Sequence, residues 1–362
     1  MVCNRISYRN FRNIAEAELR FAPGTNLLFG SNAEGKTNAL EGVSLFSGGR
    51  SFRSARDKEL IRFGEPFSVL RLDFSDEKRS QTMEIRLRAD GRKQLFKNGV
   101  AIRRLSEFVG VFRAVVFCPQ HLSLVRDGPD VRRAFLDGAL SQLSPAYLHH
   151  LQRYQAALSQ RNALLRQMQA GRESSPETAE VWSEELARLS ETLGRQREAY
   201  ALRLNDCVRQ IFGDMTGGRE LPAVAYSPLR SAEEYRRLYR ENLAQEIRFG
   251  STLYGVHRDD LKIQLNGREA KRYASQGQQR SLALALKMAE SELSRALSGE
   301  RPVLLLDDIL SELDESRQRY ILSGLGQTQA IITSCDRSVS GAAALSYRVE
   351  KGSYTPVPRA EQ

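Results

Sequence analysis

The sequence predicts an α/β nucleotide-binding fold into which a pair of long antiparallel helices is inserted. Three observations predict this fold. The pattern GxxxxGK[ST] occurs at residues 30–37, between an apolar run and a helix-like stretch. A second apolar run at residues 303–306 ends in two acids, Asp307 and Asp308. Between these motifs, over about residues 129–212, the spacing of apolar residues changes to that of helices.

Composition limits the class of protein. The chain has 362 residues, which predicts two domains or one large domain with an insertion. Hydrophobic residues make up 41% and charged residues 27%, so the chain can form a core and is not wholly disordered. No run approaches the roughly 18–20 apolar residues of a membrane span. The first residues lack the apolar centre of a signal peptide, so we expect a cytoplasmic protein.

The cysteines and the net charge indicate the compartment and the kind of partner. The four cysteines lie far apart and form no CxxC pair, which argues against a zinc ribbon or a disulfide framework and fits a reducing compartment. Lys and Arg number 54 against 44 Asp and Glu, giving a net charge of +10. An excess of this size favours a polyanionic partner, nucleic acid first.

Much of the positive excess falls in residues 50–104, which hold 15 Lys and Arg against 8 Asp and Glu. Residues 68–74 and 83–88 alternate apolar and polar, and residues 89–92 form a hairpin turn signal. We expect half-buried antiparallel strands with a basic exposed face that binds DNA phosphates without reading sequence. A solvated face balanced by local acids is the alternative. The candidate contacts are Arg50, Arg53, Arg56, Arg86, Arg88, Arg92, Lys93 and Lys97.

The remaining elements follow from periodicity. Strands are expected at residues 5–8, 15–21 and 24–29, with a loop at 10–13 and a helix from Lys36 to about Phe46. Two long helices flank a polar loop at 171–176, and strands resume near Ala223 and at 260–265. We therefore expect a nucleotide-binding lobe from residues 1–125 and 250–362, and a helical second lobe from residues 126–249.

The phosphate loop has a specific physical basis. Its glycines let backbone N–H groups curl around phosphate oxygens, and the helix N-terminus adds a partial positive charge. Lys36 is expected to reach the β- and γ-phosphates, and Thr37 to hold Mg²⁺. Ala33 replaces a usual glycine at a position where a side chain tolerates positive φ poorly. The expected nucleotide contacts here are Gly30, Ser31, Asn32, Ala33, Glu34, Gly35, Lys36, Thr37 and Asn38.

Two further motifs complete the predicted site. Asp307 follows a buried strand and is expected to hold Mg²⁺, while Asp308 is placed to polarise the attacking water. A core strand followed by a helix cap is the alternative. Residues 275–280 read SQGQQR and open an alanine- and leucine-rich helix, so Ser275 and Gly277 can offer an anion a hydroxyl and a backbone N–H. An ordinary serine N-cap is the alternative here.

The order of these motifs resembles that of the ABC-type ATPase heads of chromosome maintenance proteins. More closely, the chain is similar to the RecF family of bacterial recombination mediators. The likeness spans about residues 1–350 and includes residues 10–13, 51–53, 130–137, 257–261 and 306–314. It implies an ABC-type head with a mixed sheet, an antiparallel strand-rich subdomain and an inserted helical hairpin lobe.

The resemblance also implies a composite active site. ATP bound by the phosphate loop of one protomer would be covered by Ser275, Gly277 and Gln278 of a second, with Asp314 at the dimer seam. Gln120 would contact the metal and the attacking water, and a surface loop amide is the alternative. With it the expected catalytic residues are Asp308, Gln120 and Lys36, and the expected Mg²⁺ ligands are Thr37, Asp307 and Gln120. Arg12 is expected to touch the nucleotide, although a surface arginine is the alternative.

The function implied by the resemblance is an ATP-switched DNA-binding protein of recombinational repair in the bacterial cytoplasm. ATP would dimerise it on duplex or gapped DNA, slow hydrolysis would release it, and RecO and RecR would join it in loading RecA. Asp308 stands where many ABC ATPases have glutamate, and this predicts slow turnover. Thr333 or Ser334 stands where transporters have a histidine, which argues against a transport ATPase.

Other SMC-like clamp ATPases and the ATPase head of a nuclease remain as alternatives. A nuclease would need a further metal site, and only residues 257–260, HRDD, offer one. We favour a structural role for that segment.

Overall fold

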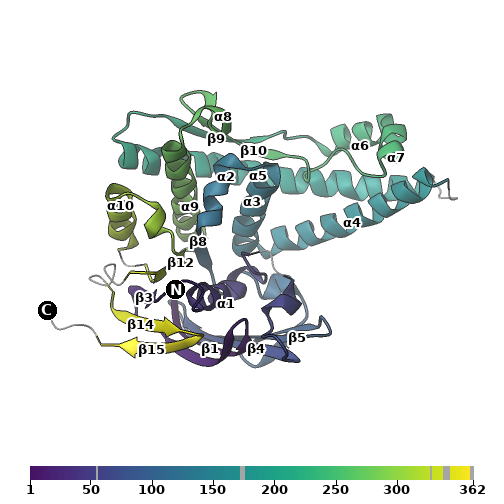
Figure 1. Cartoon of the computed structure of the whole chain (residues 1–362). Coiled ribbons are helices and arrows are strands. Elements are labelled where there is room, and N and C mark those ends of the chain that lie inside the picture. Colours follow the sequence, from purple (N-terminus) through teal and green to yellow (C-terminus); the bar gives the residue numbers. More distant parts are fainter. Residues whose placement is uncertain (54–55, 172–175, 327, 337–342, 359–362) are drawn as a thin grey trace. The chain divides into compact units, whose positions relative to one another are not determined.

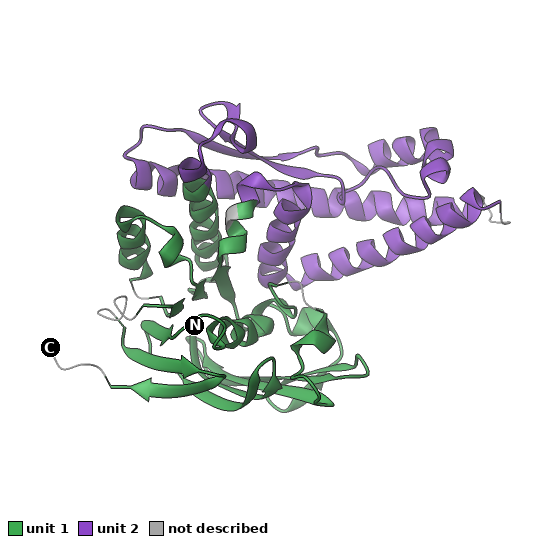
Figure 2. Cartoon of the chain, in the orientation of Figure 1, with its two compact units in different colours: residues 1–123, 280–362 green, residues 124–279 purple. Residues whose placement is uncertain are grey.

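The computed structural model describes the chain except residues 54–55, 172–175, 327, 337–342 and 359–362 (Figure 1). The chain forms two compact units (Figure 2). Unit 1 comprises Met1–Ser123 and Arg280–Gln362, and unit 2 comprises Leu124–Gln279.

The central sheet of unit 1 has the order β15-β14-β3-β13-β12-β8 and is parallel except for β15. Every residue of β12 and β13 is buried, which explains their continuous apolar sequence. The strands expected at 24–29 and 303–306 are thereby confirmed. Their bounds are β3 Thr25–Phe29, β8 Ala114–Phe117, β12 Val303–Asp307, β13 Ala330–Ser334, β14 Leu345–Glu350 and β15 Ser353–Val357.

The second sheet of unit 1 is antiparallel, with the order β2-β1-β4-β5-β6-β7. One face is buried and the other is wet, as the alternation predicts: Leu70, Leu72 and Ile85 are fully buried, whereas Arg71 and Arg86 are exposed. The loop expected at 10–13 is shorter in the structure, where a turn joins Phe11 of β1 to Ile14 of β2. The bounds are β1 Val2–Phe11, β2 Ile14–Arg20, β4 Phe67–Ser75, β5 Ser80–Arg88, β6 Lys93–Lys97 and β7 Val100–Ile102.

Helices and short turns complete unit 1. Helix α1 starts at Lys36, directly after the glycine of the phosphate loop, and buries Leu40, Val43 and Phe46. The expected helix is confirmed and ends two residues later than predicted. The bounds are α1 Lys36–Gly48, α10 Glu315–Leu325, η1 Asp57–Leu60, η2 Leu105–Glu107, η3 Pro119–Leu122 and η4 Leu310–Glu312.

Unit 2 is built on the predicted pair of long helices. Helix α4 runs over Pro145–Gln169 and α5 over Pro176–Thr216, and the two pack against each other. At 1.5 Å per residue α5 is about 60 Å long, whereas the periodicity predicts helices of roughly 40–50 Å. Most of the expected connecting loop lies outside the described residues. The other elements are α3 Pro129–Leu143, α6 Ala232–Glu241, α7 Leu243–Phe249, α8 Ala270–Tyr273, β9 Pro222–Ser227, β10 Asp260–Leu265 and β11 Arg268–Glu269.

Two helices contain the borders between the units: α2, at Ser123–Arg126, and α9, at Gln276–Ser298. The predicted border near residue 125 agrees with the first of these to within two residues.

The predicted second border, at 249/250, differs from the structure, which groups residues 250–279 with unit 2. The reason is strand pairing: β10 pairs with β9 in register from Asp260 opposite Ser227 to Leu265 opposite Pro222. Arg132 of α3 also holds Asp260, with Nε–Oδ1 and Nη2–Oδ2 distances of 2.7 and 2.9 Å.

A fully buried ion pair ties the helices of unit 2 together. The Arg161 guanidinium donates to Glu246 Oε2 at 2.6 Å, to Thr252 Oγ1 at 2.9 Å and to Ser183 Oγ at 2.9 Å. It also lies 4.7 Å from the centre of the Tyr239 ring. Because a buried charge is tolerated only when its donors are satisfied, this pairing fixes where α4 meets the segment after α7.

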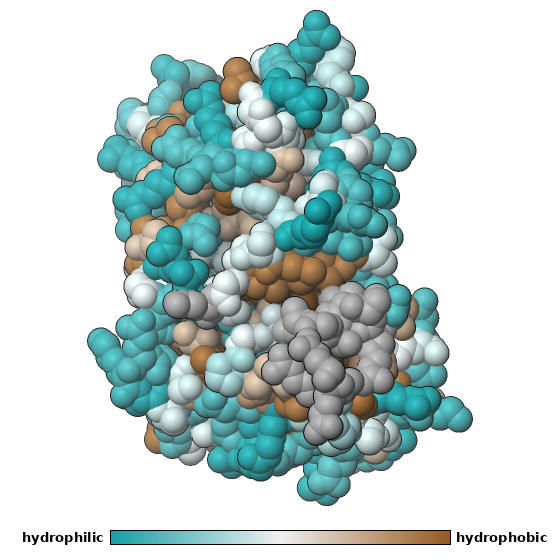
Figure 3. Space-filling view, turned by 90° about the vertical axis from the view of Figure 1, so that its left-hand side faces the viewer, coloured by the Kyte–Doolittle hydropathy of each residue, from teal (hydrophilic) through white to brown (hydrophobic). Residues whose placement is uncertain are grey.

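No helix among the described residues is long and apolar enough to cross a membrane. The face shown in Figure 3 is largely hydrophilic, with several separate apolar areas.

Gly42→Ala tests the packing of α1 beneath the phosphate loop. A β-carbon at Gly42 would lie 2.3 Å from Tyr8 Cε1 and 3.1 Å from Leu70 Cδ2. We expect a loss of about 1–3 kcal/mol in the free energy of unfolding, measured by urea denaturation, because an overpacked core must shift. Gly48→Ala is the control, since its β-carbon meets nothing within 4 Å. Equal stability of the two variants would contradict this packing.

Candidate nucleotide-binding site

Three adjacent parallel strands bring the polar groups of the site to one edge. Strand β3 leads into the phosphate loop, β13 ends near Thr333, and β12 ends at Asp307. Thr37 Oγ1 and Thr333 Oγ1 donate to Asp307 Oδ1 at 2.8 and 2.9 Å. The Asp308 N–H donates to Thr333 Oγ1 at 2.9 Å. Ligands of open α/β sheets collect at this carboxyl edge, so the two motifs predicted separately form one site.

The conformation of the phosphate loop explains its glycines. Gly30 has φ 155° and Gly35 has φ 117°. A β-carbon on Gly30 would lie 2.4 Å from Val349 O in β14, so only glycine fits there. Ala33 has φ 66°, which confirms that this alanine adopts the left-handed conformation.

Lys36 is curled into the loop. Its side chain is buried, and Nζ donates to Gly30 O at 2.5 Å and Ser31 O at 2.8 Å, with Cys335 Sγ at 3.6 Å. An ammonium held by two loop carbonyls lies where it can exchange those partners for phosphate oxygens.

Thr37 and Asp307 fit a magnesium ion. One hydroxyl and one carboxylate oxygen 2.8 Å apart are the hard oxygen donors that Mg²⁺ takes, the rest of its shell being phosphate and water. Burial raises the pKa of Asp307 above its usual range, and the hydrogen bonds from Thr37 and Thr333 oppose this only in part. A bound divalent cation would favour the ionised carboxylate.

The other two predicted catalytic residues lie at the same sheet edge. Gln120 is exposed on η3, directly after β8, and β8 pairs with β12. Asp308 follows β12 with φ 48°, an uncommon conformation that Asp tolerates better than most residues. Of the two residues expected in place of the transporter histidine, Thr333 contacts both acids through its hydroxyl.

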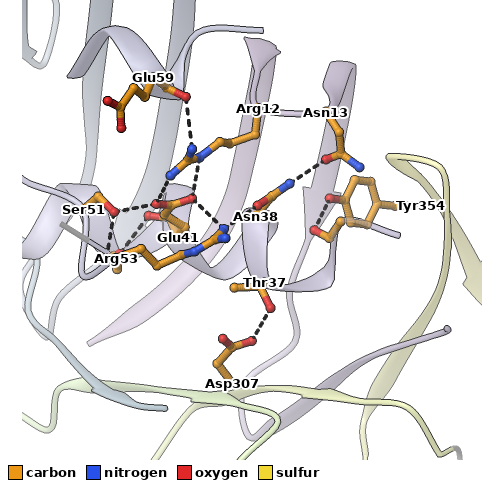
Figure 4. A network of polar contacts seen from close by, with 12 residues as sticks. Arg12, Asn13, Thr37, Asn38, Glu41, Ser51, Arg53, Glu59, Asp307 and Tyr354 are labelled. Atoms are coloured by element: carbon orange, nitrogen blue, oxygen red, sulfur yellow. Dashed lines mark hydrogen bonds and ion pairs between the residues drawn. The ribbon is translucent and has the colours of Figure 1, made fainter. Parts of the chain in front are cut away.

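A buried carboxylate that the sequence analysis missed organises the neighbouring arginines (Figure 4). Glu41 on α1 is fully buried and accepts from Arg12 at 2.8 and 2.9 Å and from Ser51 Oγ at 2.5 Å. Arg53 lies 3.6 Å from the same carboxylate and donates to Asn38 Oδ1 at 2.9 Å. The sequence signal for the role of Glu41 is that a charged residue stands in a helix turn that is otherwise predicted to be buried.

Two arginines that the sequence predicts to contact ligands, Arg12 and Arg53, belong to this network. Arg12 donates to Glu41 and to Glu59 O at 3.1 Å, so its guanidinium is already engaged. Arg53 was expected on the DNA surface. The structure places it beside Asn38, the residue after Thr37, and its charge lowers the pKa of Asp307, which burial raises.

In this single chain Ser275 caps a helix, which is the alternative stated for it above. Gln278 N–H donates to Ser275 Oγ at 3.3 Å and Ser275 N–H to Gln278 Oε1 at 2.6 Å, a reciprocal cap of α9. Ser275 is nevertheless exposed. Ser275, Gly277 and Gln278 belong to unit 2, whereas the phosphate loop belongs to unit 1. Asp314 caps α10, accepting from Arg317 N–H at 3.0 Å.

The predicted DNA contacts are largely balanced by acids. Arg86 pairs with Glu84 at 2.5 Å and lies over the Phe96 ring, and Lys93 donates to Gly49 O and pairs with Asp57. Arg88 and Arg92 both approach Asp90. Among the described residues, the side-chain charges of Arg50, Arg56 and Lys97 form no ion pair, although the backbone N–H of Arg56 donates to Glu59 Oε2 at 3.3 Å.

The HRDD segment has structural contacts throughout. His257 Nδ1 lies 2.5 Å from Tyr154 Oη and its Nε2 lies 3.1 Å from Thr252 O. Tyr226 donates to Asp259, and Asp260 holds Arg132. No group of three or more potential metal ligands occurs among the residues that the structure describes. These contacts agree with the structural role favoured for the segment.

The fold and the site define an ABC-type P-loop ATPase head with an inserted helical lobe. The family model described as the RecF/RecN/SMC N terminal domain matches residues 2–354. A protein of Heliobacterium modesticaldum named DNA replication and repair protein RecF is 40% identical over 334 residues, covering 90% of this chain and 89% of its own. One so named from Clostridium tetani is 39% identical, covering 90% of each chain. The chain belongs to the RecF family.

Comparison with solved structures supports the same family. The recombination mediator protein RecF with ATP, described as part of the RecFOR pathway, has a TM-score of 0.92 and 31% identity, covering 99% of this chain and 98% of its own. An Smc head domain from Pyrococcus yayanosii has a TM-score of 0.58 at 13% identity, covering 99% and 97%, and shares the fold alone.

Asp259→Asn tests the buried HRDD carboxylate in unit 2. Burial raises the pKa of Asp259 to about 6, above the ordinary 3.8 of an unfolded aspartate. The folded state therefore holds this proton more tightly, and ionisation weakens folding as pH rises from about 4 to 6. Relative to the parent, Asp259→Asn should gain about 1–3 kcal/mol of unfolding free energy between pH 4 and pH 7.

The measurement is guanidinium denaturation of both proteins at the two pH values. A difference between parent and Asp259→Asn that does not change with pH would show that Asp259 ionises as it does in the unfolded chain.

Proposed function

We propose that this chain is an ATP-dependent, DNA-binding ATPase of bacterial recombinational repair, switched by nucleotide between a monomer and a dimer. The observation that carries the proposal is the contact between Thr37 and Asp307, which joins the phosphate loop to the acid-bearing strand. That pairing is the Mg²⁺–triphosphate site of P-loop ATPases. The ATP in the solved structure of the RecF relative supports ATP as the ligand.

The residues of unit 1 divide the work of binding and hydrolysis. Backbone N–H groups of the phosphate loop and the start of α1 hold the phosphates, with Lys36 neutralising their charge. Thr37 and Asp307, with Gln120 at the same sheet edge, would hold Mg²⁺, and the bound ion would supply charge stabilisation to the phosphates. Asp308 accepts a proton from the attacking water. Its side chain is one methylene shorter than glutamate, which supports slow turnover.

Closure of the site requires a second copy. Ser275 and Gly277 open a long helix of 23 residues, whose N-terminus favours an anion, and Ser275 is exposed. We infer that the α9 N-terminus of one protomer covers the γ-phosphate bound by the other. Since nucleotide then binds the dimer better than the monomer, it shifts the population to the dimer.

Duplex or gapped DNA is the proposed partner of the dimer. The net charge of +10 supports a polyanion. The local pairing of Arg86, Arg88, Arg92 and Lys93 with acids points to modest affinity per copy, which dimerisation would raise by offering two surfaces. The relative described as a recombination mediator of the RecFOR pathway supports RecO and RecR as partners in loading RecA.

Lys36→Met tests nucleotide binding. Methionine keeps the length of the side chain and removes the ammonium that faces the loop. We expect ATP affinity to fall about 10- to 100-fold, the loss of hydrogen bonds to a charged group, measured with a fluorescent ATP analogue. Lys78→Met, in the exposed turn before β5, is the matched control. Unchanged affinity of Lys36→Met would exclude this role for Lys36.

Ser275→Arg tests the shared site. The variant should bind ATP as the parent does but lose nearly all ATPase turnover, because the bulky cation blocks closure of the dimer. Ser231→Arg is the matched control: Ser231 is also the N-cap of a unit 2 helix with a reciprocal cap, and its loss costs the same capping bond. Normal turnover by Ser275→Arg, measured as phosphate release, would argue for a site complete in one chain.

A further inference from the structure

An acidic residue stands within the phosphate loop. Glu34 precedes Gly35 and Lys36, in a loop that must hold the negative charges of a triphosphate. Its carboxylate accepts the backbone N–H of Lys351 through Oε2. Its carbonyl oxygen accepts the N–H of Gly352 at 2.8 Å. The carboxylate and the backbone carbonyl of Glu34 therefore both accept hydrogen bonds from residues outside the loop.

The groups that hold Glu34 come from one tight turn. Lys351 and Gly352 form the two-residue connection between β14 and β15, with φ 48° and φ 80°. Two successive positive φ values are those of a type I′ hairpin turn. Consecutive backbone N–H groups of such a turn form a concave donor site for an anion. Here that site is occupied by the carboxylate and the carbonyl of Glu34.

A second turn meets the same residue. Asn13, in the turn between β1 and β2, donates from Nδ2 to Glu34 O at 3.1 Å. The Tyr354 hydroxyl of β15 donates to Gly35 O at 3.0 Å, and Asn13 contacts Asn38 of α1 (Figure 4). The two turns also touch each other, because a β-carbon on Gly352 would lie 2.7 Å from Asn13 O.

We propose that Glu34 is a positioning residue through which the β14–β15 turn fixes the phosphate loop for ATP. The inference rests on the proposed function, in that it assumes this loop binds ATP. The turn holds the carboxylate by N–H donors and pins the carbonyl of Glu34. The backbone N–H groups of Gly35 and Lys36, one and two residues further on, are thereby set for phosphate. A C-terminal hairpin thus controls a loop more than 300 residues earlier in the chain.

The test compares ATP affinity and dissociation rate across five variants, using a fluorescent ATP analogue with Mg²⁺. Glu34→Ala removes the accepting side chain, and Gly352→Ala distorts the turn. Each should weaken ATP about three- to tenfold, as expected for the loss of one or two hydrogen bonds to a charged acceptor. Because both act on the same junction between the turn and the phosphate loop, the double variant should bind ATP no more weakly than the weaker-binding single variant.

Two controls separate positioning from charge and from strain. Glu34→Gln keeps an oxygen that accepts the Lys351 N–H and removes the charge, so it should bind ATP as the parent does. Gly99→Ala imposes the same strain on the β6–β7 turn, where Asn98 and Gly99 have φ 50° and φ 80° and a β-carbon on Gly99 meets nothing within 4 Å. It should leave ATP binding unchanged.

Several results would overturn the proposal. Glu34→Ala binding ATP as tightly as the parent would do so, as would equal affinities of Gly352→Ala and Gly99→Ala. A double variant whose losses multiply would show two independent effects. If Glu34→Gln binds ATP several-fold more tightly than the parent, charge rather than positioning governs the loop.

The comparison of Glu34→Ala with Glu34→Gln decides the matter even if Gly352→Ala does not fold. Failure of the parent chain to bind ATP would instead remove the proposed function. A parent that binds ATP, together with an unaffected Glu34→Ala, removes only the present inference.

Discussion

The hydrogen bond between Thr37 Oγ1 and Asp307 Oδ1 is the contact on which the rest of the site depends. It joins groups 270 residues apart in sequence, and it forms only because β13 lies between β3 and β12. Asp307 at the end of β12, Thr333 of β13 and Thr37 at the start of α1 present one carboxylate and two hydroxyls at a single edge of the sheet. The parallel sheet is thus what turns two separate motifs into one oxygen-rich site.

Each unit contains a buried charged group that fixes the geometry of its own elements. In unit 1, fully buried Glu41 collects Arg12, Ser51 and Arg53 beside α1. In unit 2, fully buried Arg161 and Glu246 fix the start of the segment that leads to β10 and α9. Breaking a buried pair of this kind leaves an uncompensated charge and costs several kcal/mol, roughly 3–5. The elements that carry the phosphate loop in unit 1, and those that lead to β10 in unit 2, are therefore each held by a buried charged cluster of their own unit.

Local sequence was enough to predict the elements and the chemistry at strand ends, because periodicity and loop–helix junctions are short-range signals. The phosphate loop, the strand before Asp307 and Asp308, and the long helices were predictable for this reason. The border at residue 279 was not, since it depends on β10 pairing with β9 across a separation of more than 30 residues. The contacts of Glu41 and Glu34 could not be predicted from sequence either. Their partners lie on other turns, and a solvated glutamate has the same local sequence pattern.

The central claim is that two copies close over a shared triphosphate, and sedimentation velocity tests it most directly. The parent chain is run without nucleotide, with ADP, and with a non-hydrolysable ATP analogue and Mg²⁺, each with and without duplex DNA. The account predicts a dimer only with the analogue, and more DNA carried with that dimer than with the ADP form. A chain that remains a monomer at saturating analogue, even with duplex present, would contradict it.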